Sequence, residues 1–121
     1  GLQTFVKLNP TLLSFPVVRK ILDDAGFSYI GIKQESFDHD IQYDAAVAML
    51  IRLRAAAKTR NQNFGVKLTN TLGSVNNLGR LPGDEMYMSG RALFPLSITA
   101  IVKSSVLGSA ESKVSPEETL S

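Results

Sequence analysis

The sequence predicts an α/β fold, namely part of a (β/α) barrel of the TIM type with about three parallel βα units. Short segments of β-branched and aromatic character alternate with longer amphipathic segments, and crossovers of helical length join parallel strands. A complete barrel of this type needs about 250 residues, whereas the chain has 121. We therefore expect a fragment of a larger barrel.

The first βα unit follows from the opening residues. A strand is predicted over residues 4–9, and it stops at Asn9, because the Asn-Pro pair favours a turn. A helix is predicted over residues 15–25, with Ser14 available as its cap and Gly26 as its stop.

The second βα unit comes next. The compact apolar run at residues 27–33 predicts a second strand, followed by a polar loop. Apolar residues then recur at steps of three and four over residues 41–60, which predicts a helix, with Asp38 or Asp40 available to cap it.

The last third of the chain begins with a strand predicted over residues 64–69. A long loop rich in Gly, Asn and Pro is expected over residues 70–90, and a helix over residues 95–106. Serine and glutamate dominate residues 104–121, which predicts a poorly ordered tail. The predicted domain therefore spans residues 1–103.

Composition excludes several classes of function. The formal net charge is only +2, with no basic block, so nucleic acid is not an expected partner. No apolar stretch approaches the roughly 20 residues of a membrane helix, and we expect a cytoplasmic protein without membrane contact. The absence of cysteine excludes disulfides, thiolate metal sites and iron–sulfur ligands within these residues. No metal site is predicted.

Alternation along the strands sorts their side chains between the barrel axis and the helices. The positions expected to face the helices are Val6, Leu8, Ile30, Ile32, Val66 and Leu68. Those expected to face the axis include Lys7, Lys33 and Lys67, each near the end of its strand. Buried ammonium groups need an anionic or hydrogen-bonding occupant, which predicts a phosphate- or carboxylate-bearing ligand. The alternative is a solvated rim where these lysines pair with Glu35, Asp38 or Asp84.

Two further stretches allow two interpretations each. His39 lies between Asp38 and Asp40 and suits a general acid or base, but a helix-capping loop explains the same residues. The stretch at residues 86–90 suits a lid over a flat ligand, or it fills a gap beneath a loop. No catalytic residue is assigned.

Four longer sequence motifs resemble the barrel region of the selenate reductase subunit family, and the resemblance covers residues 1–101. They are FVKLNPT at residues 5–11, ESFDHD at 35–40, FGVKLTNT at 64–71 and EMYMSGRALFPLS at 85–97. That family's barrel is similar to the flavin-binding barrel of dihydroorotate and dihydropyrimidine dehydrogenases. The resemblance thus implies an oxidoreductase subunit with an FMN-type site.

Members of that family are long multidomain proteins. The resemblance implies that the barrel is followed by iron–sulfur segments and by a part that binds FAD and NADPH, none of which lies in this chain. The implied activity is electron transfer from a nicotinamide to a small oxidant, and the implied partner is the rest of the multidomain protein. The alternative is a scaffold barrel that has lost flavin and positions redox domains.

The resemblance also implies cofactor-binding residues. These are Lys7, Asn9, Lys67, Asn70, Thr71, Ser89 and Gly90. Two strands end in Val-Lys-Leu, so both Lys7 and Lys67 match the lysine that contacts the flavin ring in the dehydrogenases. The late strands that hold the flavin phosphate are expected beyond residue 121, so the chain alone should bind flavin weakly or not at all.

Overall fold

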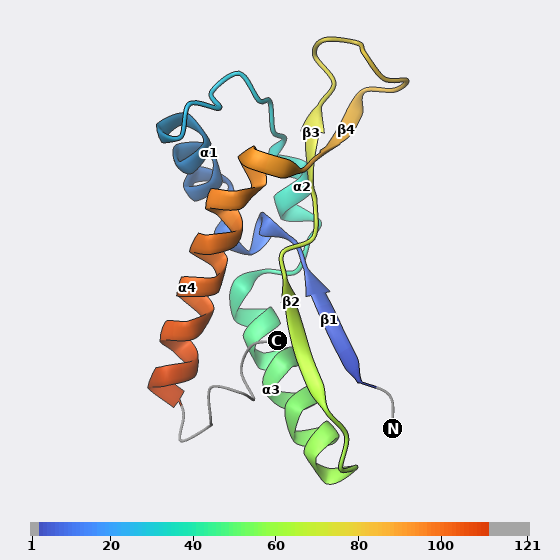
Figure 1. The fold of residues 1–121 in the computed structure, drawn as a ribbon, viewed down its shortest axis with the longest axis vertical. Coiled ribbons are helices and arrows are strands. Elements are labelled where there is room, and N and C mark those ends of the chain that lie inside the picture. Colours follow the sequence, from blue (N-terminus) through green and yellow to red (C-terminus); the bar gives the residue numbers. More distant parts are fainter. Residues whose placement is uncertain (1–2, 112–121) are drawn as a thin grey trace.

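The computed structural model describes residues 3–111, with side chains described as far as residue 105. The helices and strands are, in chain order, β1 (Thr4–Leu8), η1 (Pro10–Leu13), α1 (Phe15–Asp24), α2 (Gln34–Asp38), α3 (Tyr43–Thr59), β2 (Phe64–Leu68), β3 (Leu72–Val75), β4 (Glu85–Met88), η2 (Gly90–Ala92) and α4 (Leu93–Glu111) (Figure 1). The predicted α/β class is confirmed. Two small sheets are present among these residues: β1 and β2 pair in parallel, and β3 and β4 form an antiparallel hairpin.

The parallel sheet has one face packed against α3, which runs alongside β1 and β2 (Figure 1). Leu8 and Val66 are buried there with Leu12 and Ala46. The partly buried residues packed against this core include Val6, Met49, Leu50 and Leu68. The predicted orientation of the apolar strand residues toward the helices is thereby confirmed for both strands.

A second, larger core joins α1, α2, α4 and the hairpin. Val18, Leu22 and Leu96 have no exposed side-chain area in it, and Leu72 is 1% exposed. Complete burial of such a side chain contributes about 1.5–3 kcal/mol of transfer free energy. The contact between α4 and the rest of the chain therefore holds the hairpin beside α1 and α2.

The predicted strand over residues 27–33 is wrong, because this segment forms no ladder. Arg19 instead donates from its guanidinium to the carbonyls of Phe27 and Ile30, which a neighbouring strand would otherwise bond. One backbone bond, from Val75 N to Gly31 O at 2.8 Å, ties the segment to β3. As a result β1 pairs directly with β2, and the crossover between them contains only helices and loops.

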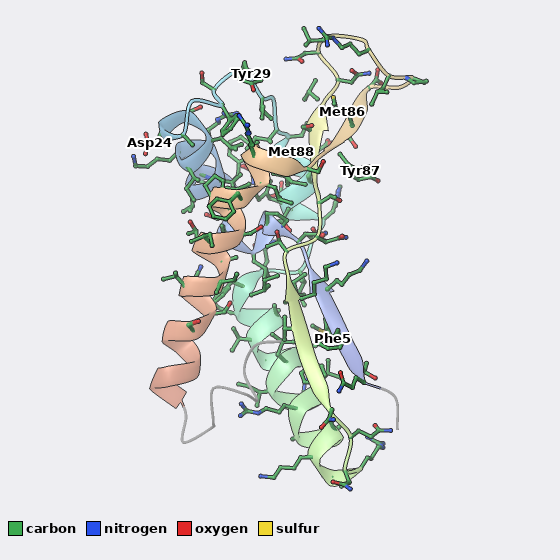
Figure 2. All side chains as sticks on the ribbon, in the orientation of Figure 1. Phe5, Asp24, Tyr29, Met86, Tyr87 and Met88 are labelled. Atoms are coloured by element: carbon green, nitrogen blue, oxygen red, sulfur yellow. The ribbon has the colours of Figure 1, made fainter. Side chains whose placement is uncertain are left out.

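The predicted loop over residues 70–90 is also wrong in part, because it contains the hairpin of β3 and β4. Leu72, Ser74 and Met88 are buried on one face of the hairpin, while Tyr87 is 78% exposed on the other (Figure 2). Met88 thus fills the larger core. The gap-filling interpretation holds for this methionine.

The helices agree with the predicted segments but differ at their ends. No side-chain cap bond forms at the start of α1 or α3, so capping by Ser14, Asp38 or Asp40 was wrong. Helix α4 begins two residues earlier than predicted and continues to Glu111, so the predicted loss of order does not hold for residues 104–111. The rest of that predicted tail lies outside the described residues. Across residues 3–111, no helix is long and apolar enough to cross a membrane.

Candidate functional site

The face of β1 and β2 that lies away from α3, here called the open face, carries two adjacent lysines. The parallel register pairs Lys7 with Lys67, and Phe5 with Gly65. Both lysines are exposed, and among the side chains of residues 3–105 neither has a carboxylate within salt-bridge distance. Neighbouring strands are about 4.8 Å apart, so the two cations repel each other. An anion or a carbonyl-rich ligand edge would relieve that repulsion.

Lys33 does not join this pair. Its Nζ lies 3.2 Å from Glu85 Oε1, and both side chains are partly exposed, at 41% and 54%. Because the segment before it is not a strand, Lys33 is instead the N-cap residue of α2. The predicted trio of axis-facing lysines is therefore wrong for Lys33, and Glu85 is its partner in place of the three predicted carboxylates.

Asn9, at the end of β1, belongs to a small polar network. Its Nδ2 donates to Asp40 Oδ2 at 2.8 Å, and Thr11 Oγ1 donates to the same oxygen at 2.7 Å. Thr11 is buried, while Asn9 and Asp40 are half-buried. His39 is exposed at the end of α2. This network links the end of β1 to the segment before α3, which lies about 30 residues later.

Asn70, Thr71, Ser89 and Gly90 lie at the base of the hairpin, next to the end of β2. Asn70 N donates to Leu8 O at 2.8 Å, which continues the parallel pairing beyond the last strand residues. The antiparallel register pairs Leu72 with Met88, so Thr71 and Ser89 occupy the next opposed positions. The fold therefore brings these residues to the carboxyl ends of β1 and β2, where the active sites of (β/α) barrels lie.

Asp40 and Thr11, which form the polar network with Asn9, were not predicted from the sequence as part of this region. Asp40 was interpreted as a helix cap, and Thr11 was not singled out at all. Their signal was weak, since an Asp before a helix is an ordinary capping pattern.

A second link, between Thr69 Oγ1 and Ser97 Oγ at 2.7 Å, ties the end of β2 to α4. We call Lys7, Asn9, Lys67, Asn70 and Thr71 the lysine site.

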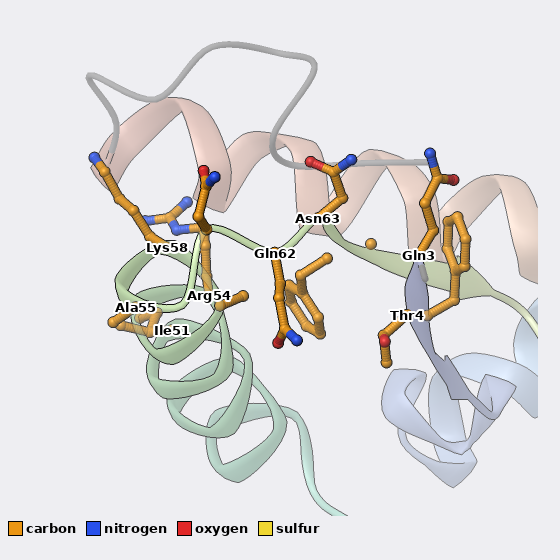
Figure 3. A pocket seen from close by; sticks show the side chains of 13 residues that line it. Gln3, Thr4, Ile51, Arg54, Ala55, Lys58, Gln62 and Asn63 are labelled. Atoms are coloured by element: carbon orange, nitrogen blue, oxygen red, sulfur yellow. The ribbon is translucent and has the colours of Figure 1, made fainter. Parts of the chain in front are cut away.

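A hollow of about 550 Å³ lies at the opposite, amino-terminal ends of β1 and β2. Figure 3 shows Arg54 and Lys58 of α3 on one side of it and Gln3 and Thr4 on the other. In (β/α) barrels this end of the strands serves stability, and chemistry occurs at the carboxyl ends. The lysine site is therefore the better candidate for function.

Comparison with known proteins places these observations in a family. The family model described as "Oxidoreductase YgfK, N-terminal TIM-barrel domain" matches residues 1–111, beyond residue 101 where the sequence resemblance was expected to end. "Putative oxidoreductase YgfK" of Escherichia coli strain K12 is 68% identical over 98 residues, which are 81% of this chain and 10% of that protein. The protein of the same name from Escherichia coli O157:H7 gives the same values. The chain thus spans about a tenth of the length of these relatives. No solved structure matches it.

Proposed function

The chain belongs to this family of oxidoreductase N-terminal TIM-barrel domains, and on that basis we propose that it contributes two adjacent strands to the flavin site of a larger oxidoreductase. In this proposal Lys7 and Lys67 together contact the flavin. Because Lys7 and Lys67 are register partners on adjacent strands, both can contact one ligand, and the proposal does not require a choice between them. The rest of the larger protein supplies the other sides of the site.

The observation that carries the proposal is the unpaired lysine pair on the open face. Lys7 and Lys67 are register partners on adjacent strands, and neither has a carboxylate partner among the described side chains. Such a pair favours a ligand with negative charge or several carbonyl oxygens. The pyrimidine edge of a flavin ring and its phosphate both have this character.

The remaining residues of the lysine site fit the same ligand. Asn70 and Thr71 are half-buried at the end of β2 and offer amide and hydroxyl groups. A bound flavin supplies hydride and electron transfer. The chain's own residues bind and orient it, and their positive charge favours the electron-rich form. By the resemblance, NADPH, FAD, iron–sulfur clusters and a small oxidant would engage other parts of the larger protein.

Addition of FMN is expected to raise the melting temperature of the chain. A ligand at ten times its dissociation constant stabilises the folded state by about 1.4 kcal/mol, which corresponds to a few degrees for a domain of this size. Because the expected binding is weak, FMN is titrated to millimolar concentration while the visible absorbance is followed in parallel. Lys7→Ala and Lys67→Ala should each reduce the shift.

Lys58→Ala serves as the matched control, because it removes the same charge from the exposed end of α3, away from the lysine site. Its melting shift with FMN should equal that of the unchanged chain. If FMN changes neither the melting temperature nor the absorbance of this chain, and the larger oxidoreductase that contains the barrel is folded but shows no flavin absorbance, the flavin proposal fails. The scaffold function, in which the barrel only positions redox domains, would then replace it.

A further inference from the structure

The loop that joins β3 to β4 is held in one shape by Asn76. Its backbone N–H donates to Asp84 O at 2.9 Å, which extends the hairpin beyond the last pair of strand residues. Its side-chain Nδ2 donates to Leu81 O at 2.6 Å and to Gly83 O at 2.8 Å. Pro82 lies between these two acceptors and has a fixed φ angle. The loop therefore has its shape before any partner binds.

This braced loop exposes apolar side chains around a cation. Leu78 is 72% exposed and Leu81 is 53% exposed. Arg80 is also exposed, and among the described side chains no carboxylate lies within salt-bridge distance of it. Turns of soluble domains are normally polar, whereas grouped apolar side chains and arginine are typical of protein contacts. We call Leu78, Arg80 and Leu81 the hairpin tip.

The hairpin tip projects from the end of the domain toward which β1 and β2 point (Figure 1). The base of the hairpin is fixed, because Leu72 and Met88 are buried in the larger core. A second tie is the bond from Val75 N to Gly31 O at 2.8 Å. A loop that is both braced and firmly anchored loses little conformational entropy when it binds a partner. The tip is thus suited to contact a domain that lies beyond the carboxyl ends of the strands.

We propose that the hairpin tip docks on another domain of the larger oxidoreductase, in an apolar recess bordered by a carboxylate that pairs with Arg80. The residues matched in the Escherichia coli relatives make up only 10% of those proteins, so most of their length lies outside this domain. The proposal rests on family membership and does not require that the barrel binds flavin.

The small size of the tip favours a tethered partner over a second copy of the chain. A stable contact between separate chains involves about 20–30 residues on each side, many more than the tip offers. Within one polypeptide the connecting chain keeps the local concentration of the partner high, so a small contact is sufficient. Docking within one polypeptide therefore agrees better with the exposed residues than self-association does.

Site-specific photo-cross-linking in the larger oxidoreductase tests this contact. Benzoylphenylalanine replaces Leu78, and mass spectrometry identifies the residues that it joins on irradiation. We expect cross-links within one polypeptide to residues outside 1–121, with a yield that stays constant over about a tenfold dilution. The matched control carries the label at Val17, which is 44% exposed on α1, and it should not join the same residues.

Second substitutions beside the Leu78 label test the chemistry of the contact. Leu81→Asp and Arg80→Glu should each lower the cross-link yield at least about fivefold, because docking would bury an unpaired carboxylate or oppose two like charges. Asn76→Ala should lower the yield at least about twofold, because the released loop must be ordered on binding. Arg52→Glu makes the same charge reversal on an exposed position of α3 and should leave the yield unchanged.

The other outcomes would overturn the proposal. A cross-link to a second copy, with doubled mass and a yield that rises with concentration, would replace docking by self-association. A yield no higher than that of the Val17 label, or one unchanged by both Leu81→Asp and Arg80→Glu, would show that the hairpin tip has no such partner. A larger protein without flavin that gives the expected cross-links would contradict only the flavin proposal.

Discussion

Leu96→Ala is expected to lower the free energy of unfolding of the chain by about 2–5 kcal/mol, the range for such a truncation in a core. Leu96 has no exposed area and lies where α4 meets the larger core. The loss combines the transfer free energy of the removed carbons with the cavity that they leave. Urea unfolding followed by circular dichroism measures the change. A small domain is stable by only about 5–15 kcal/mol, so this variant should be close to its folding limit.

The same chemical change at Leu78 provides the control. Leu78 is 72% exposed in the β3–β4 loop, so its replacement by alanine should change stability by no more than about 0.5 kcal/mol. A Leu96→Ala effect as small as that at Leu78 would show that α4 does not pack on the core as described.

Lys67→Glu is expected to change stability and flavin binding in opposite directions. The substitution replaces two facing cations with a cross-strand pair of opposite charge, which should stabilise the free chain by about a few tenths of a kcal/mol, given the solvent exposure. It also removes a charge-assisted hydrogen bond to the ligand, worth about 1.5–3 kcal/mol. The dissociation constant for FMN should therefore rise about 10- to 100-fold.

Urea unfolding and FMN titration on the same preparation measure both effects. Lys58→Glu is the control, because it makes the same charge reversal beside the hollow at the other end of the strands. It should leave FMN binding within about threefold. Loss of stability together with loss of binding in Lys67→Glu would instead indicate that Lys67 has a structural role, contrary to the exposed position described above.

The sequence was sufficient to predict β1 and β2, because their apolar residues alternate along the strand. In β1 and β2 the apolar residues alternate, and the same residues pack against α3 in the structure. It was insufficient for residues 27–33, which have equally apolar composition. There the outcome depends on Arg19, which is close in sequence but whose bonds to the Phe27 and Ile30 carbonyls are set by tertiary packing.

Neither the β3–β4 hairpin nor the polar network of Asn9, Thr11 and Asp40 was predicted from the sequence, and the reasons are related. The strands β3 and β4 are only four residues each, and glycine and asparagine around them favour a loop on composition alone. Asp40 lies before a helix, and only the fold shows that its carboxylate contacts Asn9 and Thr11 instead of the helix end. By contrast, the residues taken from the family resemblance all lie near the carboxyl ends of β1 and β2. Their role in cofactor binding stays a prediction.

NMR of the lysine side chains tests most directly whether Lys7 and Lys67 bind the flavin together. Dimethylation with ¹³C-formaldehyde labels each lysine and keeps its charge, and single Lys→Arg variants assign the signals. On titration with FMN, the Lys7 and Lys67 signals should shift together along one binding curve, while those of Lys58 and Lys103 stay in place. Shifts at Lys58 or Lys103 without shifts at Lys7 and Lys67 would contradict this joint binding.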